Sequence, residues 1–485
     1  MQHKHLKQVL LALCISCNAG YSLAGDDAFE SIKTVAEQLN SANAQYLLAK
    51  MYELGKGTNV NLKQAIKWYT ASAEQGYVKS QEKLGMVSLN GKLRQKKDKK
   101  RAKFWFEKAA KQNSTEAQYQ LGLLMYQGKQ YSKNSYKTAS EWCLKAAANN
   151  HVDAQAMLGE MYLDGKGIKA NPENAVMWYE QAANQGHLTS AFNLARLYEG
   201  GHGTNKNMAE SIRWYKWAAK EDHTQAQLKL AKIYQTGESV PKSRSESIKW
   251  YKKVAVKNNE NAQYQLAVLL LEENDNNAVS EAMSWLKKVA IKGRTEAQLE
   301  LAKRYQHGNG IDKSLSDAVY WYEKAADGDD ISAQFQLSRI FLHGNLDIRD
   351  EESGISWLTT SAKRDIPEAQ YELGFRYYKG KGLKKSAQQA YYWLQKASDN
   401  KIIKATYQIG YMLTKGIGVP KNIDQGLQLL HYAADEQFVE AQLKLAQIYE
   451  QGIIVKEDLE TAKSWYLTAA ENGSTHAQER LDLQF

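Results

Sequence analysis

The chain has 485 residues, of which 43% are hydrophobic and 24% are charged, and only four are prolines. These proportions are typical of a folded helical protein, and no run of about 18 apolar residues is present that could form a transmembrane helix. The formal charge of +10 is modest for this length. It indicates a soluble protein or, alternatively, an acidic partner such as an anionic glycan or surface.

Residues 1–24 have the pattern of a secretory signal peptide. Lys4 and Lys7 precede a largely apolar stretch, and Ser22-Leu23-Ala24 places small residues at the two positions that signal peptidase reads. We therefore expect export, with cleavage after Ala24, to the periplasm or the medium. Lipidation of Cys17 at the outer membrane is the alternative, because Ile15-Ser16-Cys17 resembles the end of a lipoprotein signal.

Cys143 is the one cysteine that remains if residues 1–24 are removed, whereas lipidation would also retain Cys17. A single internal cysteine provides no disulfide framework. Cys143, beside Trp142, is therefore expected to be a small core residue.

Residues 25–43 are expected to form an N-terminal capping helix. Within them, Asp26 to Asn40 carries apolar side chains at helical spacing: Phe29, Ile32, Val35, Ala36 and Leu39. This stretch lacks the tryptophan of the repeats that follow, as a capping half-repeat does.

The next part of the chain is built from one repeated unit, seen whole in residues 154–186. Its first half is an amphipathic helix in which Gly159 leaves room for a neighbouring backbone. Gly165 and Gly167 end that helix, since glycine accepts positive φ. Pro172 suits the start of a second helix, which ends at Gly186.

The unit recurs every 35 to 37 residues. The small residue that opens each first helix is found at Ala44, Ser80, Ala117, Ala154, Ser190, Ala226, Ala262, Ala297, Ala333, Ala369, Ala405, Ala441 and Ala477. A tryptophan keeps the same period in the second helix, at Trp68, Trp105, Trp142, Trp178, Trp214, Trp250, Trp285, Trp321, Trp357, Trp393 and Trp465, with Leu429 in the eleventh repeat. We therefore predict twelve repeats over residues 44–476 and a C-terminal capping helix over residues 477–485.

The tryptophan is expected to hold the stack together, because a single helix pair cannot bury both of its apolar faces. Each ring would fill the gap against the next pair and bury about 150–250 Å². On this basis, Trp285→Ala would lower the free energy of unfolding by about 3–5 kcal/mol.

The repeat has a recognisable pattern. Ala-Gln opens the first helix, Gly or Ala follows five residues after the alanine and Tyr eight after it, Gly-x-Gly forms the turn, and Ala-x-x-Trp-Tyr and Ala-Ala mark the second helix. This pattern resembles the Sel1-like repeat, and it is similar to tetratricopeptide repeats, which have a shorter period of 34 residues. The resemblance covers residues 44–485. It implies an all-α fold, a right-handed α-solenoid used as a scaffold or adaptor.

Several stretches depart from this pattern. The seventh repeat has no turn glycine between Leu269 and Asn277, which predicts a shortened loop and a bend in the stack. The second and third repeats replace Gly-x-Gly by Gly91-Lys92-Leu93 and Gly128-Lys129-Gln130, which predicts altered loops. Asp482 replaces the small packing residue of the last helix and suits a helix that faces water.

No catalytic, phosphate-binding or paired-cysteine metal motif is found in the sequence, so we predict no enzyme activity, metal or cofactor. His151, His187 and His223 share one position in consecutive repeats, about 10 Å apart, which is too far for a common metal. They are interpreted as solvated loop histidines, with a pH-sensing ladder as the alternative.

Candidate partner-binding residues lie six positions after the opening small residue of the first helix. Basic residues recur there, followed by two aromatic residues: Lys50, Arg196, Lys232, Lys303 and Arg339, then Phe375 and Tyr411. Because first helices line the concave side of related solenoids, we predict a basic stripe that passes into an aromatic patch and holds an acidic peptide or glycan. A solvated helix face is the alternative.

Two further features are candidates for contacts. Trp217 is outside the tryptophan period and marks either an interface or the junction with the next repeat. The densest basic run could bind an anionic lipid or cell-wall polymer, although a solvated loop is the simpler interpretation: Lys92, Arg94, Lys96, Lys97, Lys99, Lys100, Arg101 and Lys103. The expected export argues against nucleic acid.

The resemblance implies an exported, non-catalytic scaffold for protein partners in the periplasm, at the outer membrane or outside the cell. Relatives suggest a scaffold for exopolysaccharide secretion, a regulator of cell-wall enzymes or envelope signalling, or a secreted factor that binds a host protein such as secretory immunoglobulin A. A weak β-lactam hydrolase is a further alternative. The relatives described in that way carry a disulfide in each repeat, which this chain lacks.

Overall fold

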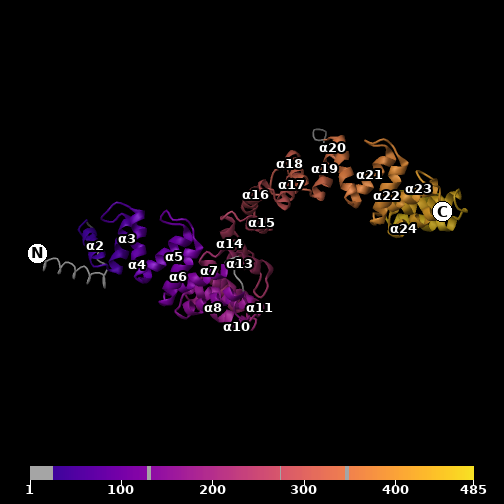
Figure 1. Ribbon diagram of the computed structural model, residues 1–485. Helices are drawn as coiled ribbons and strands as arrows, with labels where there is room; N and C mark the ends of the chain where they lie inside the picture. The colour runs from indigo at the N-terminus through magenta and orange to yellow at the C-terminus, as the bar shows by residue number, and fades with distance from the viewer. Residues whose placement is uncertain (1–25, 128–132, 274, 345–348, 485) are drawn as a thin grey trace. The chain divides into compact units, whose positions relative to one another are not determined.

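The computed structural model describes residues 26–127, 133–273, 275–344 and 349–484, and these residues form 26 helices and no strand (Figure 1). The predicted signal peptide with Cys17, the loop Gly128-Lys129-Gln130 and the last residue, Phe485, lie outside the described residues.

The helices follow one another with short connections, and most have 13 residues. They are α2 (Asp26–Gln38), α3 (Ala42–Leu54), α4 (Leu62–Glu74), α5 (Val78–Asn90), α6 (Lys99–Lys111), α7 (Thr115–Gln127), α8 (Lys133–Ala148), α9 (Val152–Asp164), α10 (Pro172–Asn184), α11 (Leu188–Gly200), α12 (Met208–Lys220), α13 (Thr224–Thr236), α14 (Arg244–Ala255), α15 (Glu260–Leu271), α16 (Asn276–Ile291), α17 (Thr295–His307), α18 (Leu315–Asp327), α19 (Ile331–His343), α20 (Glu351–Lys363), α21 (Pro367–Lys379), α22 (Ala387–Asp399), α23 (Ile403–Lys415), α24 (Ile423–Asp435), α25 (Val439–Gln451), α26 (Leu459–Glu471) and α27 (Thr475–Gln484).

Each repeat is a pair of helices, of which the odd-numbered one is the first helix and the even-numbered one the second helix. The pairs run from α3 and α4 to α25 and α26, with α2 before them and α27 after them. The predicted all-α solenoid of about twelve repeats is therefore confirmed.

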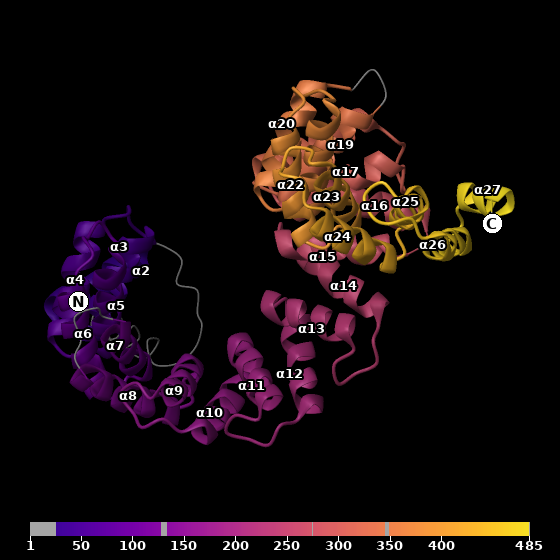
Figure 2. The ribbon, with the colours of Figure 1, turned by 90° about the vertical axis from the view of Figure 1, so that its right-hand side faces the viewer.

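The chain divides into an N-terminal unit, residues 1–253, and a C-terminal unit, residues 254–485, with the boundary inside α14. In the N-terminal unit the first helices follow the inner side of an arc and the second helices follow its outer side (Figure 2). Neighbouring first helices approach each other there, as α9 and α11 do.

The residue after the tryptophan position is a core residue of each second helix. It is buried in all twelve repeats: Tyr69, Phe106, Cys143, Tyr179, Tyr215, Tyr251, Leu286, Tyr322, Leu358, Leu394, Leu430 and Tyr466. The prediction that Cys143 is a core residue is thus confirmed. Burial raises the pKa of its thiol to about 12.

The tryptophans have a different place from the one predicted. Trp285 is only partly buried, and Lys288 Nζ lies 4.1 Å from the centre of its ring. Trp393 is buried, but it packs with Leu358 and Ala362 of the preceding repeat rather than with the next one. Successive helical side chains are rotated by about 100°, so Trp285 lies beside the core while Leu286 points into it. Five of the other periodic tryptophans are buried: Trp105, Trp214, Trp250, Trp321 and Trp393.

Glycine allows the two helices of a repeat to approach closely. A Cβ added at Gly159 would lie 2.6 Å from the ring of Tyr179, and one added at Gly122 would lie 2.5 Å from the sulfur of Cys143. The predicted need for a small residue at this position is therefore confirmed, although the neighbour that Gly159 admits is a side chain rather than a backbone.

The two glycines of the turn have separate roles. Gly165, with φ of 67°, is the left-handed C-cap of α9. Gly167, with φ of 78°, lies against the preceding repeat, where an added Cβ would collide with the carbonyl oxygen of Tyr136 in α8. In a repeat that has it, the second glycine of the Gly-x-Gly turn therefore lets the turn pack against the repeat before it.

The predicted loop departures are found where the structure describes them. In the second repeat, Leu93 and Arg94 both have positive φ, of 51° and 59°. In the seventh repeat, α15 ends at Leu271 and α16 begins at Asn276, so the connection is shorter than the loop between α9 and α10.

A buried glutamine explains the Ala-Gln pattern. The side-chain amide of Gln227 donates a hydrogen bond of 3.0 Å to the carbonyl of Ala219, near the end of the preceding second helix. Gln81 and Gln263 donate equivalent bonds, of 3.0 and 2.9 Å, to Ala73 and Ala255. Each of these carbonyls also accepts a backbone N–H from the turn that follows its helix, so the glutamine adds a second hydrogen bond and ties the next first helix to it.

A glutamate near the end of the first helix also joins neighbouring repeats. Glu199 accepts a hydrogen bond of 2.8 Å from Tyr215 of its own repeat, and Lys229 of the next repeat lies 2.6 Å from its other oxygen. Glu53 makes the same two contacts with Tyr69 and Lys83.

Candidate functional site: the outward position of the first helices

We call the sixth residue after the opening small residue of each first helix the outward position. None of its thirteen occupants is buried. They are Lys50, Met86, Leu123, Glu160, Arg196 and Lys232 in the N-terminal unit, and Val268, Lys303, Arg339, Phe375, Tyr411, Gln447 and Leu483 in the C-terminal unit. Met86, Leu123 and Glu160, which were not among the predicted residues, separate Lys50 from the later basic residues.

The four main predicted basic residues are exposed. Arg196 and Lys232 lie on α11 and α13 of the N-terminal unit, and Lys303 and Arg339 lie on α17 and α19 of the C-terminal unit. None of the four forms an ion pair with a carboxylate in the described part of the chain. Their charges are therefore available to a partner.

Lys303 and Arg339 line one cavity of about 430 Å³, which we call the basic pocket. Arg304 also lines it, but its guanidinium donates a 2.8 Å hydrogen bond to Glu300 and a 3.1 Å bond to the carbonyl of Asn309. Since Glu300 is neutralised in this way, the positive charges of Lys303 and Arg339 dominate the pocket.

Tyr322 forms part of the wall of the basic pocket and comes from the second helix α18. Its hydroxyl donates a hydrogen bond of 2.8 Å to Gln306. Burial raises the pKa of this phenol to about 12, against a lowering effect of Arg339. The hydroxyl therefore stays protonated at neutral pH, and it adds no negative charge to the pocket.

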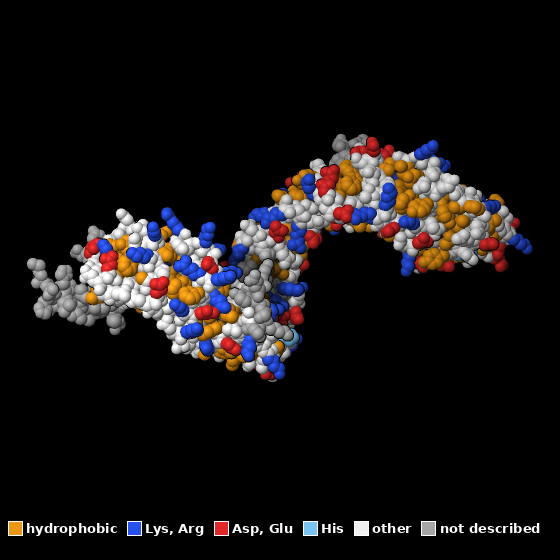
Figure 3. Space-filling model, viewed as in Figure 1, with side chains coloured by type: hydrophobic (Ala, Val, Ile, Leu, Met, Phe, Trp, Pro, Cys, Tyr) orange, Lys and Arg blue, Asp and Glu red, His pale blue; other side chains and the backbone are white. Residues whose placement is uncertain are grey.

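Phe375 and Tyr411, the two predicted aromatic residues, are half-buried within a larger cluster. The ring centres of Phe375 and Tyr371 lie 6.0 Å apart, and Lys379 Nζ lies 5.5 Å from the Phe375 ring centre. Lys444 Nζ lies 5.2 Å from the ring centre of Tyr411. Figure 3 shows hydrophobic side chains gathered over the α21–α24 part of the surface.

Trp217 lies on the second helix α12 and is half-buried rather than fully exposed. Its ring packs edge-on against Trp214, with 6.2 Å between the ring centres. It belongs to a second helix, and therefore not to the face that carries the other predicted residues.

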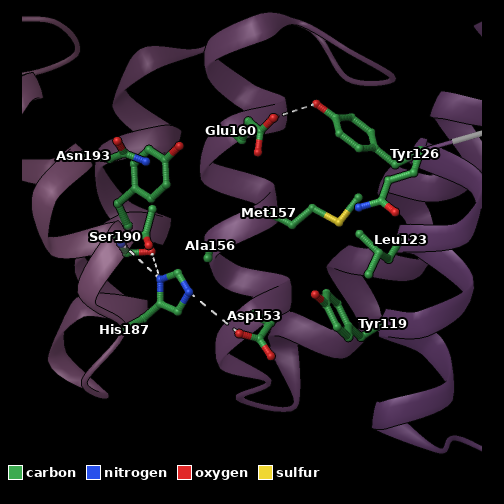
Figure 4. A pocket seen from close by; sticks show the side chains of 13 residues that line it. Tyr119, Leu123, Tyr126, Asp153, Ala156, Met157, Glu160, His187, Ser190 and Asn193 are labelled. Atoms are coloured by element: carbon green, nitrogen blue, oxygen red, sulfur yellow. Dashed lines mark hydrogen bonds and ion pairs between the residues drawn. The ribbon is translucent and has the colours of Figure 1, made fainter. Parts of the chain in front are cut away.

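A second cavity, of about 280 Å³, lies on the first helices α7, α9 and α11 of the N-terminal unit (Figure 4). We call it the acidic pocket, because Asp153 and Glu160 of α9 line it together with Tyr119, Tyr126 and Tyr179. It was missed in the sequence analysis. The signal that could have revealed it is the single carboxylate, Glu160, at the outward position.

The two carboxylates affect the tyrosines of the acidic pocket. Burial, and then Asp153, raises the pKa of Tyr119 to about 12. Burial, and then Glu160, raises the pKa of Tyr126 to about 12 and also raises that of Tyr179. The phenols are therefore neutral, and the negative charge of the pocket belongs to the carboxylates.

The three aligned histidines cap helices, so their interpretation as solvated loop residues is wrong. The Nδ1 atoms of His151, His187 and His223 accept the backbone N–H of Ala154, Ser190 and Ala226, at 3.3, 3.1 and 3.2 Å. Burial lowers the pKa of His187 and that of His223, which keeps Nδ1 free to accept.

The basic run is found in the loop before α6 and in the first turns of that helix, and most of its side chains are exposed. Asp98 lies within it as the N-cap of α6, and its side chain accepts the N–H of Arg101. Lys103 pairs with Glu107 at 3.5 Å.

Within residues 26–127, 133–273, 275–344 and 349–484, no three His, Cys, Asp or Glu side chains are grouped as metal ligands would be. None of the helices in these ranges is long and apolar enough to cross a membrane.

A family model described as Sel1 repeat matches most of the chain. The matched segments are residues 42–77, 78–114, 115–151, 152–187, 189–223, 224–255, 295–330, 331–365, 367–401, 403–438 and 439–474. The interval between residues 255 and 295 contains α15 and α16, the repeat without a turn glycine.

The chain is similar to the crystal structure of c5321, a protective antigen present in uropathogenic Escherichia coli strains, with 29% identity and a TM-score of 0.62 over 94% of this chain and 97% of that one. It is also similar to a Sel1 repeat protein from Oxalobacter formigenes, with 30% identity and a TM-score of 0.40 over 51% of this chain and 99% of that one. No curated protein matches the chain.

Proposed function

Because this chain belongs to the Sel1 repeat family, whose members generally mediate protein–protein interactions, we propose that it is an exported, non-catalytic scaffold that holds its partner on the first helices. In the C-terminal unit, this surface would consist of the basic pocket and the aromatic cluster around Phe375 and Tyr411. The proposed ligand is an acidic, partly aromatic segment of a partner protein.

One observation carries this proposal: Lys303 and Arg339 line the same cavity and neither forms an ion pair within the described residues. Two such cations about one repeat apart can bind successive carboxylates of an extended peptide, and the Arg339 guanidinium can bind one of them in bidentate fashion. The next first helices, α21 and α23, offer Phe375 and Tyr411, whose faces suit aromatic or proline side chains. An anionic glycan is the second candidate, because sugars also stack on aromatic rings.

Export is the second part of the proposal, and it rests on residues 1–24. Cleavage after Ala24 would give a periplasmic or secreted protein, and lipidation at Cys17 would give an outer-membrane one. The chain is similar to c5321, which is described as a protective antigen, and this description suits an exported protein. A secreted factor that binds a host protein, such as secretory immunoglobulin A, is one candidate.

Crosslinking in the native cell envelope, followed by mass spectrometry, tests both parts. We expect crosslinks from the partner to Lys303, and a mature N-terminus at Gly25. A lipidated Cys17 would instead indicate an outer-membrane scaffold, and an uncleaved N-terminus would contradict export.

A pair of variants tests the binding surface directly. We expect Lys303→Gln with Arg339→Gln to weaken capture of the crosslinked partner at least tenfold. The matched control is Lys381→Gln with Lys384→Gln, which removes the same charge from exposed loop residues of the same unit. Equal capture by both double variants would contradict the proposed surface.

A further inference from the structure

The acidic pocket of the N-terminal unit differs from the rest of the first-helix face in the sign of its charge. Glu160 is the only carboxylate among the thirteen occupants of the outward position, where five are basic. Arg196 occupies the same position one repeat later and does not line this pocket. Because of this carboxylate, the acidic pocket is expected to prefer a cationic ligand, whereas the basic pocket is expected to prefer an anionic one.

Glu160 is exposed, and one of its two carboxylate oxygens accepts a hydrogen bond. One oxygen accepts a hydrogen bond of 3.2 Å from the hydroxyl of Tyr126, and no described cation lies within ion-pair distance of either oxygen (Figure 4). Lys166 Nζ lies 5.8 Å from the ring centre of Tyr126, but this ammonium is paired with Asp164 at 2.6 Å. The charge of Glu160 is therefore available to a ligand.

Next to this carboxylate, the pocket has an apolar and aromatic surface. Met157 lies one helical turn before Glu160 on α9, and Leu123 lies opposite on α7 (Figure 4). The rings of Tyr126 and Tyr179 also line the pocket, and aromatic faces attract cations. An aliphatic stem that ends in a cation fits this combination of surfaces.

The second carboxylate lies at the other end of the pocket. Asp153 precedes Glu160 by seven residues on α9, which is about 10 Å along the helix axis. His187 Nε2 lies 3.7 Å from Asp153, and burial keeps this histidine neutral. One Glu160 oxygen already accepts the Tyr126 hydroxyl, so the geometry favours a single contact from a point charge at the other oxygen over a bidentate arginine, which would use both oxygens.

We propose that the acidic pocket binds the lysine side chain of an extended protein segment, with the ammonium at Glu160 and the stem over Met157 and Leu123. A cavity of about 280 Å³ suits one side chain rather than a complete small-molecule ligand. The inference rests on the proposed scaffold function only for the source of the lysine, and it concerns a site that the basic pocket does not share.

Saturation-transfer NMR with the purified protein tests this site. The probes are two acetylated and amidated pentapeptides, Gly-Ala-Lys-Ala-Gly and the same peptide with norleucine in place of lysine. Norleucine keeps the stem but not the ammonium. We expect the lysine peptide to bind with at least tenfold higher affinity, and we expect Glu160→Gln to remove this difference.

Control variants separate the site from other effects. Glu180→Gln removes an exposed carboxylate from the second helix α10 and should leave peptide binding unchanged. Thermal unfolding establishes that each variant is folded. Equal binding of the two peptides, no binding of either, or an unchanged preference in Glu160→Gln would each overturn the proposal.

The same experiment distinguishes this inference from the proposed function. The variant with Lys303→Gln and Arg339→Gln should bind the lysine peptide like the wild-type protein. If that variant no longer binds the partner but still binds the lysine peptide, the two sites are independent. Each proposal can then fail without contradicting the other.

Discussion

The basic pocket and the acidic pocket are built on the same framework but carry opposite charge. Each is lined by neighbouring first helices and by the tyrosine that follows the tryptophan of a second helix, Tyr322 in one and Tyr179 in the other. The difference lies mainly at the outward position, where the basic pocket has Lys303 and Arg339 and the acidic pocket has Leu123 and Glu160. In this solenoid the buried positions fix the shape, and the outward position sets the chemistry.

The largest expected effect concerns the shared framework. We expect Tyr179→Ala and Tyr322→Ala each to lower the free energy of unfolding by about 3–5 kcal/mol, because both rings are buried at equivalent positions. Chemical denaturation measures the loss, and hydrogen exchange locates it. A large loss in one unit and none in the other would show that the two pockets do not share a framework.

The next effect tests which aromatic or aliphatic position forms the core. We expect Leu286→Ala to cost about 2–5 kcal/mol, and Trp285→Ala about 1–3 kcal/mol, since Trp285 is partly exposed. The value for Trp285→Ala is lower than the loss of about 3–5 kcal/mol expected from the sequence. Chemical denaturation of both variants decides between them, and a larger loss for Trp285→Ala would restore the original expectation.

A charge reversal tests the chemistry of the two pockets. We expect Glu160→Lys to lower the affinity for the lysine pentapeptide at least tenfold. The free energy of unfolding should change by no more than about 0.5 kcal/mol. Lys303→Glu should likewise weaken the binding of the acidic partner at least tenfold. Loss of folding in either variant would mean that the outward position is structural.

The smallest expected effect is a difference in acid sensitivity. The pKa values of His187 and His223 are lowered below 6.5 in the folded protein, so the unfolded chain binds their protons first and stability falls as the pH falls below about 6.5. A protonated Nδ1 can no longer accept the helix N–H, and loss of such a cap costs about 0.5–2 kcal/mol. In the C-terminal unit, Asn259 and Asp330 cap the corresponding helices.

Hydrogen exchange at about pH 7.5 and pH 5.5, corrected for intrinsic rates, measures this difference. We expect the N-terminal unit to lose more protection than the C-terminal unit, where His431 has a lowered pKa but caps no helix. His187→Asn with His223→Asn should restore protection at the lower pH, because asparagine is a good cap. Equal loss in the two units would refute the role of the histidine caps.

The fold could be predicted from the sequence because each repeat restates the same local instructions. The turn glycines represented by Gly165 and Gly167, the small residue represented by Gly159 and the periodic tryptophan are found in many repeats. Together they define the helices, the turns and the close contacts. The depth of Trp285 could not be predicted in this way, because the tryptophan and the residue after it recur with the same period. Periodicity says that a position matters, whereas only packing says which of two adjacent side chains is inside.

The candidate sites were harder to predict for a related reason. Lys303 and Arg339 were found from their position in the repeat, but other residues at the same position are not basic. Glu160 was one of these, and its pocket also depends on Tyr126 and Tyr179, which reach it from different helices. The helix caps formed by His151, His187 and His223 depend on side-chain geometry, which the spacing of the histidines alone does not reveal.

The Gly-x-Gly turn has a consequence for how such a chain can change over evolutionary time. At Gly167, Gly203 and Gly418 the turn meets the neighbouring repeat mainly through backbone atoms, those of Tyr136, Pro172 and Ala387. A joint made with the backbone does not depend on which side chains the neighbour carries. At Gly310 and Gly382, by contrast, the turn meets side chains, those of Val279 and of Glu351 and Ile355. Repeats joined through the backbone can therefore be duplicated, deleted or exchanged without redesign of the joint, and recombination can reassort their outward residues as independent modules.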